Sequence, residues 1–395
     1  MTDTSEALPV RKNWDARNSK APIRSIHEYP LYTDAEMIPQ GVPRVAADCP
    51  YHFLRMSTIG KPGYVRLGVI LRIDIHLVPK WQDIKTNDSL YHGGELEDEI
   101  AALASLCFGV RMRAGGESRR FQFDDDHDPL GIPVAGNHRP IPTLDLNEDR
   151  LVLPDVAKNM ESLDEEALER LEWLLDLSPE QTIALVRAAC LYQDALWIAE
   201  SEPALAWLMF VSALETAANQ WQAEKKTPAE RLTDSYPKLV EILKTAGGDD
   251  LIAKVANIIA PLCGSTKKFI DFVLHYLPPA PAKRPSESSQ VPWDSNSMEK
   301  VLRIIYKYRS KALHGGIPFP APMCEPPYKE TWYIEGTMGV AATGAGGTWM
   351  AEDIPINLHT FHYITRNVLL GWWRAMAKRD VRRENSDRDF DALTK

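Results

Sequence analysis

The sequence contains no hydrophobic run long enough to cross a lipid bilayer. A membrane-spanning helix needs roughly 20 consecutive apolar residues, and charged or polar residues interrupt every apolar run of this chain well before that length. The first residues also lack the basic and then apolar pattern of a secretion signal. These absences predict a cytoplasmic protein that does not engage a membrane.

Cysteine is scarce and irregularly spaced. The chain holds five cysteines, an odd number, and no two of them form a Cys-x-x-Cys pair. This pattern argues against a disulfide framework and against a zinc site, and it is typical of a reducing compartment. We therefore expect a protein without a metal ion or other cofactor.

The chain has no excess of positive charge. Its 45 Lys and Arg residues stand against 55 Asp and Glu residues, a formal net charge of −10. A broad nucleic-acid-binding surface is normally basic, so the whole-chain balance argues against one. One segment differs, because residues 298–314 hold five basic residues and a single acidic one, Glu299. Such a local patch can attract phosphate while the rest of the surface stays acidic.

The first part of the chain predicts a mixed domain. Residues 1–50 are rich in Pro, Asp and Arg without clear periodicity, and we expect them to form an irregular arm. Apolar and polar residues alternate over 64–77, as in a strand, and resume an extended pattern at 121–123. Between these segments, 95–108 predicts a short helix. The sequence therefore predicts an N-terminal α+β domain over residues 1–155, with a sensing or regulatory role.

After residue 163 the patterns are helical. The predicted helices are 165–176, 182–200, 202–223, 228–244, 249–261, 266–277 and 357–378, together with the helix that ends near residue 314. A proline-rich stretch at 278–293 predicts an exposed loop, and the segment 332–349 predicts a hairpin. The fold class is therefore mixed, with the α+β domain followed by an all-α helical bundle over 156–395.

The segment Tyr308–Gly316 carries the most specific chemistry. Arg309 and His314 lie five positions apart, directly before Gly315-Gly316. Arginine is a permanent cation that binds phosphate through parallel hydrogen bonds, and histidine can transfer a proton near neutral pH. Together they can cleave RNA without a metal ion, with histidine assisting attack by the ribose 2′-hydroxyl and arginine stabilising the charge that develops on the phosphate.

Helix geometry constrains how this pair can act. From Met298 to His314 the apolar residues recur at three- and four-residue steps, which predicts one buried helical stripe. At 100° per residue, Arg309 and His314 point about 140° apart on a regular helix. Two arrangements remain open. Either the glycines end the helix early so that His314 swings round, or a second copy of the chain supplies the other half of the site.

This neighbourhood resembles the HEPN superfamily of helical bundles, most closely its Apea-like branch of bacterial conflict and phage-defence proteins. The resemblance rests on Arg309, His314, the Leu-His-Gly-Gly ending and the apolar segment Ala206–Ala218 with its single acidic residue, Glu215. It covers roughly residues 180–380. One position departs from the pattern, since active members often have Asn, Asp or His where this chain has Ser310.

The resemblance implies a metal-independent endoribonuclease, acting as a toxin or an anti-phage effector. Such enzymes work as dimers with a composite site and leave a cyclic phosphate. The expected partners are therefore RNA, a second copy or a higher homo-oligomer, and a regulatory protein. The expected catalytic residues are Arg309, His314 and Glu215, and the expected substrate-binding residues are Ser310, Lys311 and Lys307.

Glu215 fits this site because a carboxylate in an apolar helix costs free energy unless it is paired. We expect it to orient Arg309 or His314 across the bundle, although it can instead pair elsewhere. An alternative function is a non-catalytic HEPN module that serves in dimerisation or in binding a partner protein or nucleotide. Ser310 and the acidic net charge favour that alternative.

Other candidate motifs are weaker. The acidic run 124–128 suggests a metal-dependent hydrolase, but adjacent loop residues rarely reach one ion and the spacing matches no calcium loop. Residues 344–347 lack the sequence context of a nucleotide-binding loop and predict a flexible turn. Asp271 and His275 share a helix face, most often a plain surface contact. Trp372-Trp373 can stack on bases, but we favour their anchoring the last helix to the core.

Overall fold

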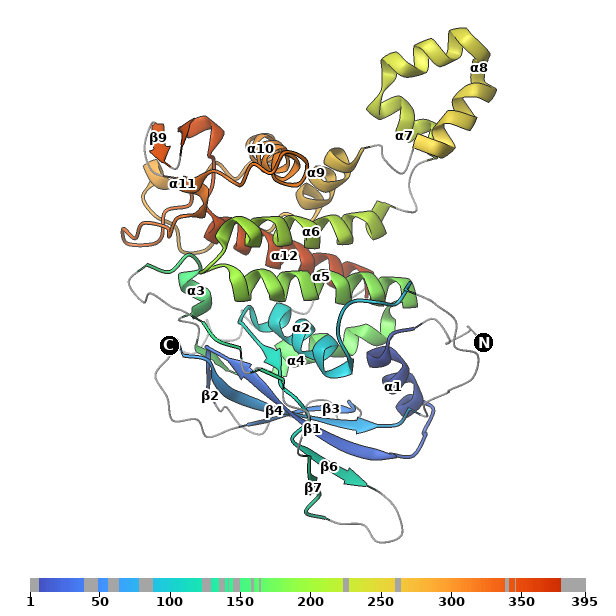
Figure 1. The fold of residues 1–395 in the computed structure, drawn as a ribbon, viewed down its shortest axis with the longest axis vertical. Helices are drawn as coiled ribbons and strands as arrows, with labels where there is room; N and C mark the ends of the chain where they lie inside the picture. The colour runs from blue at the N-terminus through green and yellow to red at the C-terminus, as the bar shows by residue number, and fades with distance from the viewer. Residues whose placement is uncertain are drawn as a thin grey trace, which may run out of the picture.

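The structure is a computed structural model of the chain. It describes residues 7–38, 49–55, 64–77, 88–122, 129–134, 139–140, 142–144, 150–157, 160–162, 165–222, 227–259, 264–337, 341–344 and 346–377. Figure 1 shows a sheet at one end, a layer of helices on it, and further layers of helices stacked toward the other end. The predicted mixture of an α+β part and a helix-rich part is confirmed at this level.

The sheet has six strands and is antiparallel, in the order β3-β4-β1-β6-β7, with β5 also paired to β1. Its strands are β1 (Ser25–Thr33), β3 (Tyr51–Arg55), β4 (Arg66–Ile75), β5 (Arg113–Ala114), β6 (Arg119–Gln122) and β7 (Ile132–Pro133). The strand predicted within 64–77 is β4, and the extended pattern near Phe121 is β6. The central strand β1 pairs with β4 along its whole length and with β5 and β6 on its other side.

The expectation of an irregular arm over residues 1–50 is wrong for the described part of that segment. It contains α1 (Pro9–Asn18), the central strand β1, and β2 (Glu36–Ile38), which pairs in parallel with β8 (Met160–Ser162). Alternation is hidden in β1 because most of its side chains are half-buried on both faces and because Pro30 interrupts the pattern. Pairing with strands on both of its sides therefore specifies β1 more than its own sequence does.

A buried helix covers the sheet. The helix α2 (Leu96–Phe108), close to the predicted 95–108, buries nearly all of its residues and packs on α5 (Pro179–Ile198). Gly109 ends it in a left-handed conformation with φ of 68°, as glycine at this position readily does. Two short helices, α3 (Pro154–Ala157) and α4 (Glu165–Glu172), follow on the way to α5. Through α2 the sheet and the later helices come into direct contact.

The helix-rich part is built on α5 and α6 (Pro203–Gln222), which pack along each other as a hairpin. The remaining helices of this part are α9 (Ser265–His275), α10 (Ser295–Gly315), α11 (Ala321–Cys324) and α12 (Leu358–Met376). The helix α6 contacts α9, α10 and α12, so it lies in the middle of the bundle. The predicted hairpin is β9 (Ala341–Gly344) with β10 (Gly347–Met350).

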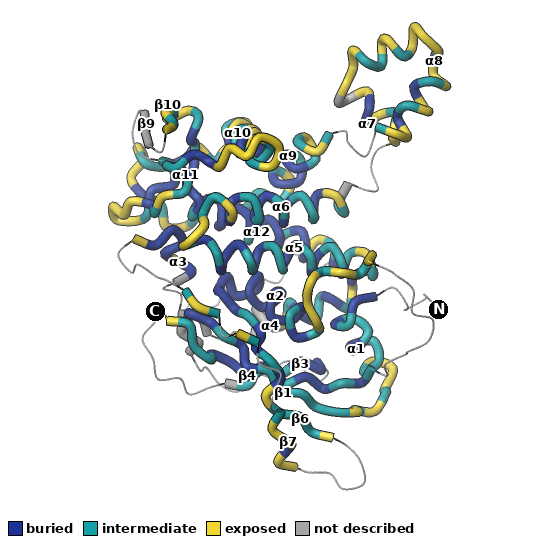
Figure 2. The backbone as a smooth tube through the Cα atoms, in the orientation of Figure 1, coloured by how far each residue is buried: buried dark blue, intermediate teal, exposed yellow. Residues whose placement is uncertain are grey.

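Two helices project from the bundle, as Figures 1 and 2 show. They are α7 (Pro228–Ser235) and α8 (Pro237–Ile259). Among the described residues, they form an apolar cluster of their own around Leu232, Ile252 and Ala256. Gly248 has φ of 65° and breaks α8 between the two helices predicted there. We name α7 and α8 together the helical arm.

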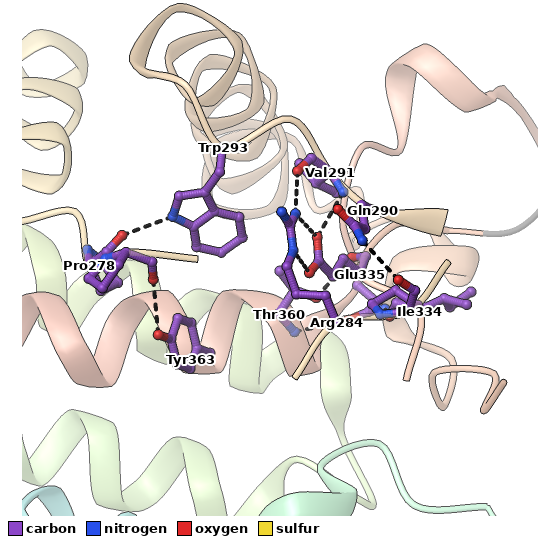
Figure 3. A network of polar contacts seen from close by, with 12 residues as sticks. Pro278, Arg284, Gln290, Val291, Trp293, Ile334, Glu335, Thr360 and Tyr363 are labelled. Carbon is purple, nitrogen blue, oxygen red and sulfur yellow. Dashed lines mark hydrogen bonds and ion pairs between the residues drawn. The ribbon is translucent and has the colours of Figure 1, made fainter. Parts of the chain in front are cut away.

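The proline-rich segment 278–293 is a loop, as predicted, but it is firmly attached to its surroundings (Figure 3). The Arg284 guanidinium donates to both carboxylate oxygens of Glu335 at 2.6 Å and to the Val291 carbonyl at 2.8 Å. The Trp293 indole donates to the Pro278 carbonyl at 2.8 Å. The Glu335 carbonyl in turn accepts the Thr360 hydroxyl at the start of α12. The loop therefore holds the entry to α10 against α12.

Apart from the helical arm, the described residues from Leu8 to Ala377 contribute to one hydrophobic core. Residues of the sheet, of α2 and of the bundle belong to the same cluster. The core therefore does not mark the predicted boundary at residue 155, and helices and strands occur on both sides of it. Trp372 and Trp373 are fully buried in this core, in line with their expected role as anchors of α12.

A buried ion pair network crosses between the two parts. The Arg111 side chain is fully buried and donates to Asp34 at 2.6 Å, to Glu200 at 2.8 Å and to the Leu196 carbonyl at 2.7 Å. Glu200 also accepts the backbone N–H groups of residues 152 and 153. Burial raises the pKa of Asp34, and the guanidinium opposes that shift. Arg111 thus connects the end of β1 with the end of α5, and through Glu200 also with residues 152 and 153.

We expect Arg111→Ala to lower the free energy of unfolding by about 3–5 kcal/mol, because it leaves two carboxylates buried without a cation. The matched control is Arg113→Ala, which removes a half-exposed partner of Asp194 and should cost no more than about 1 kcal/mol. Urea unfolding followed by circular dichroism measures both. Equal losses would show that the buried network is not the main contact between the two parts.

Candidate functional site

The structure brings two of the predicted catalytic residues together. Glu215 on α6 and Arg309 on α10 face each other, with 2.6 Å between Arg309 Nη2 and Glu215 Oε2. The Tyr306 hydroxyl donates to Glu215 Oε1 at 2.8 Å, and the Arg309 guanidinium lies 5.5 Å from the centre of the Tyr306 ring. We name these three residues the Arg309 clamp. The expectation that Glu215 orients Arg309 agrees with this geometry.

The clamp lies at the surface and holds Arg309 in one direction. The side chains of Arg309 and Glu215 are 20% and 15% exposed. Burial, and then the neighbouring Glu215 charge, raise the pKa of Tyr306 to about 12, so the phenol stays protonated and remains a donor at neutral pH. Arg309 Nε is buried and has no hydrogen-bond acceptor among the described residues. The guanidinium therefore retains unused donor capacity while Glu215 fixes its position.

Sequence reasoning missed Tyr306. It lies three positions before Arg309, and residues at that spacing are neighbours on a helix face. A tyrosine that precedes a candidate arginine by one turn is therefore a usable pattern. The Tyr306 ring also packs against α9, 5.3 Å from the ring of Phe269. The clamp thus sits where α6, α9 and α10 meet.

His314 is placed differently. It is exposed in the last turn of α10, which stays regular up to Gly315. Gly316 then caps the helix with φ of 64°, and its N–H donates to the Lys311 carbonyl. Because the glycines end the helix only after His314, this side chain does not swing round toward Arg309. The two residues remain about 140° apart around the axis and about 7.5 Å apart along it.

The predicted substrate-binding residues surround His314. Around the α10 axis, Lys307, Ser310 and Lys311 lie within about 60° of His314. Lys307 and Lys311 are exposed, Ser310 is partly buried, and Lys311 Nζ lies 5.3 Å from the centre of the Tyr308 ring. The three residues therefore accompany the histidine on the outer side of α10, while Arg309 faces α6.

Two exposed apolar side chains border His314. Leu313 is 50% exposed and Ile317 is 55% exposed, on either side of the glycine cap. Both residues lie at the C-terminal end of α10, where the helix projects beyond the clamp. A molecule that docks at this end of α10 would cover both side chains.

The other candidates find little support among the described residues. No group of three His, Cys, Asp or Glu side chains there can hold a metal ion, and the acidic run 124–128 lies outside them. Asp271 pairs with Lys267 at 3.0 Å, and the His275 ring packs against Trp221, so each has its own neighbour. Gly344 is the last residue of β9 and Gly347 is the first residue of β10, so the two residues flank the turn of the hairpin.

Comparisons of the chain with protein-family models, with curated proteins and with solved structures gave no match. None of the described helices is both long and apolar enough to span a bilayer.

We expect Glu215→Ala to lower the free energy of unfolding by about 1–3 kcal/mol, because it leaves the Arg309 guanidinium and the Tyr306 hydroxyl without their acceptor. The control, Glu299→Ala, breaks the exposed Glu299–Arg303 pair on α10 and should cost about 0.5 kcal/mol or less. Urea unfolding distinguishes the two. A Glu215 variant as stable as the control would contradict the clamp.

Proposed function

We propose that this protein is a metal-independent endoribonuclease of HEPN type, acting as a toxin or an anti-phage effector. The proposal rests on the Arg309 clamp and on an exposed histidine five positions further along the same helix. A guanidinium fixed by Glu215 is preorganised to meet the charge that develops on a phosphate. A solvent-exposed histidine is suited to removing the proton of a ribose 2′-hydroxyl.

Each side chain of the site has a distinct role in this reaction. His314 accepts the proton of the attacking 2′-hydroxyl, and Arg309 donates hydrogen bonds to the phosphate oxygens. Glu215 is a positioning residue, because it contacts Arg309 rather than the substrate. Lys307, Ser310 and Lys311 bind the RNA backbone near His314. The 2′-oxygen forms a bond to phosphorus as the bond from phosphorus to the 5′-oxygen breaks. The 5′-oxygen takes up a proton from water, which yields a cyclic phosphate and a 5′-hydroxyl.

The proposal requires a second copy of the chain. Within one chain, Arg309 faces α6 while His314 points about 140° away on a regular helix. A twofold axis near the end of α10 brings His314 of a second copy toward Arg309 of the first, because such an interface pairs the same surface from both subunits. The exposed Leu313 and Ile317 would be covered at this contact.

A second candidate is a non-catalytic module that uses the same surface only for dimerisation or for binding a partner protein or nucleotide. The full engagement of Glu215 by Arg309 and Tyr306 favours it, since the clamp also serves as an ordinary contact between helices. Ser310 favours it as well. RNA cleavage by the purified protein separates the two functions.

We expect the purified protein to cleave single-stranded RNA in excess EDTA and to leave a cyclic phosphate. Arg309→Ala and His314→Ala should each lower the cleavage rate by about 100-fold or more, the typical loss when a general acid–base or charge-stabilising group is removed. Arg303→Ala is the control, because Arg303 is exposed on α10 and pairs with Glu299. Cleavage that stops in EDTA, or that survives both substitutions, would reject the proposal.

A complementation experiment tests the shared site. When the Arg309→Ala and His314→Ala chains are co-expressed, about a quarter of the wild-type cleavage should return, because half of randomly formed dimers are mixed and each holds one intact pair. A site contained in one chain predicts no recovery, since neither variant then has both residues. Light scattering of the purified mixture confirms that dimers form.

A further inference from the structure

A second group of reactive side chains lies on the sheet, in the opposite half of the molecule from α10 (Figure 1). Ser25 and His27 occupy alternate positions of β1 and therefore share one face of the strand. The Ser25 hydroxyl lies 2.7 Å from His27 Nε2, and the other ring nitrogen, His27 Nδ1, lies 2.7 Å from Glu117 Oε1. The serine and the carboxylate thus contact opposite nitrogens of one imidazole.

The chemistry of the neighbours determines which atom carries each proton. Arg120 on β6 donates to both oxygens of Glu117, at 2.9 and 2.6 Å, so the carboxylate acts as an acceptor. His27 Nδ1 must then carry the hydrogen that it shares with Glu117. Burial lowers the pKa of His27, with Arg120 acting in the same direction and Glu117 opposing it. In the neutral ring Nε2 is the acceptor, and the Ser25 hydroxyl donates to it.

The backbone places the carboxylate at the strand. The turn that carries Glu117 is tied to β1 by hydrogen bonds from the Gly115 N–H to the Pro30 carbonyl and from the Ser118 N–H to the Glu28 carbonyl, both at 2.8 Å. A Cβ atom at residue 115 would come within 2.7 Å of the Pro30 ring. Glycine therefore permits the close approach that brings Glu117 to His27.

The three side chains differ in their exposure to solvent. A nucleophile must be open to solvent, whereas the groups that activate it can be shielded. Glu117 is almost fully buried and His27 is 17% exposed, whereas Ser25 is partly open to solvent at the start of β1. The His27 ring also stacks on that of Tyr29 at 6.4 Å, which limits its rotation. The carboxylate and the imidazole are thus shielded and fixed, and the hydroxyl is the group that an incoming molecule can reach.

We infer that Ser25, His27 and Glu117 form a second catalytic site, a serine–histidine–glutamate triad that transfers acyl groups from small carboxylic esters. A nucleophile, a base within hydrogen-bond distance and a third group that orients the base are the defining parts of such a site. This inference is independent of the nuclease activity, because it uses no residue of α6 or α10.

Ester hydrolysis at this site passes through an acyl-serine. The Ser25 oxygen attacks the ester carbonyl and forms a bond to carbon while its proton passes to His27 Nε2. The bond between the carbonyl carbon and the alcohol oxygen then breaks, and the alcohol leaves with the proton from Nε2. Water attacks the acyl-serine by the same route, giving up its proton to Nε2, and the carboxylic acid and the free serine are released. Glu117 keeps the ring oriented and stabilises its positive charge.

Covalent labelling of the full-length protein tests the inference. A fluorophosphonate probe should modify Ser25, as located by peptide mass spectrometry, and should abolish hydrolysis of p-nitrophenyl acetate. Glu117→Gln and His27→Gln should slow the labelling of Ser25 by at least about tenfold and about 100-fold, respectively. Ser118→Ala is the matched control, since Ser118 is an exposed serine in the same turn, and it should leave labelling unchanged.

Wild-type protein supplies a measurement that does not depend on how the variants fold. The labelling rate of Ser25 should fall as the pH is lowered through the pKa of His27, because protonation of Nε2 removes the acceptor. Among the described residues, Ser25, Glu117 and Tyr29 contact the imidazole, and the Arg120 charge acts on it from β6. An unlabelled Ser25, or labelling that neither the pH nor the two substitutions change, would overturn the inference and leave the contacts as a brace between strand and turn.

Discussion

The position of one buried cation, Arg111, determines how the sheet and the helices sit on each other. Its guanidinium is fully buried and pairs with Asp34 and Glu200, and its removal would leave both carboxylates in the interior without a cation. Since Asp34 follows β1 and Glu200 follows α5, the network relates the strand that carries His27 to the hairpin that carries Glu215. Two groups of reactive residues that share no side chain therefore depend on the same internal contact.

The sequence predicts best the segments whose periodicity is imposed by one-sided burial. The helix α12 is an example, and the apolar segments of α2, α5, α6 and β4 are also predicted close to their observed bounds. The two helices predicted over 228–261 anticipate the break at Gly248 in α8. The strand β1 was not, because its neighbours on both sides and on both faces allow polar residues to remain half-buried. Pairing between distant segments, such as β2 with β8, is set by the whole fold and leaves no local pattern.

At the candidate site, sequence patterns point to individual residues but not to how their side chains lie relative to one another. A carboxylate in the apolar helix α6 had to have a partner, and that partner is Arg309. The phenol of Tyr306 and the regularity of α10 up to Gly315 depend on packing against α9 and α6, which no local pattern reports. The shared site with a second copy remains a prediction. The Ser25–His27–Glu117 group joins residues ninety positions apart, so only the folded chain shows it.

The helical arm has a consequence for the motions of the clamp. Its apolar cluster has only three buried residues, so it gains little from burial and can unfold locally while the main core stays intact. The arm leaves the bundle after α6 and returns at α9, whose Phe269 packs against Tyr306. We expect opening of the arm to loosen this contact between α9 and the clamp. A molecule that binds and orders the arm would, by the same connection, reduce the conformational freedom of Arg309.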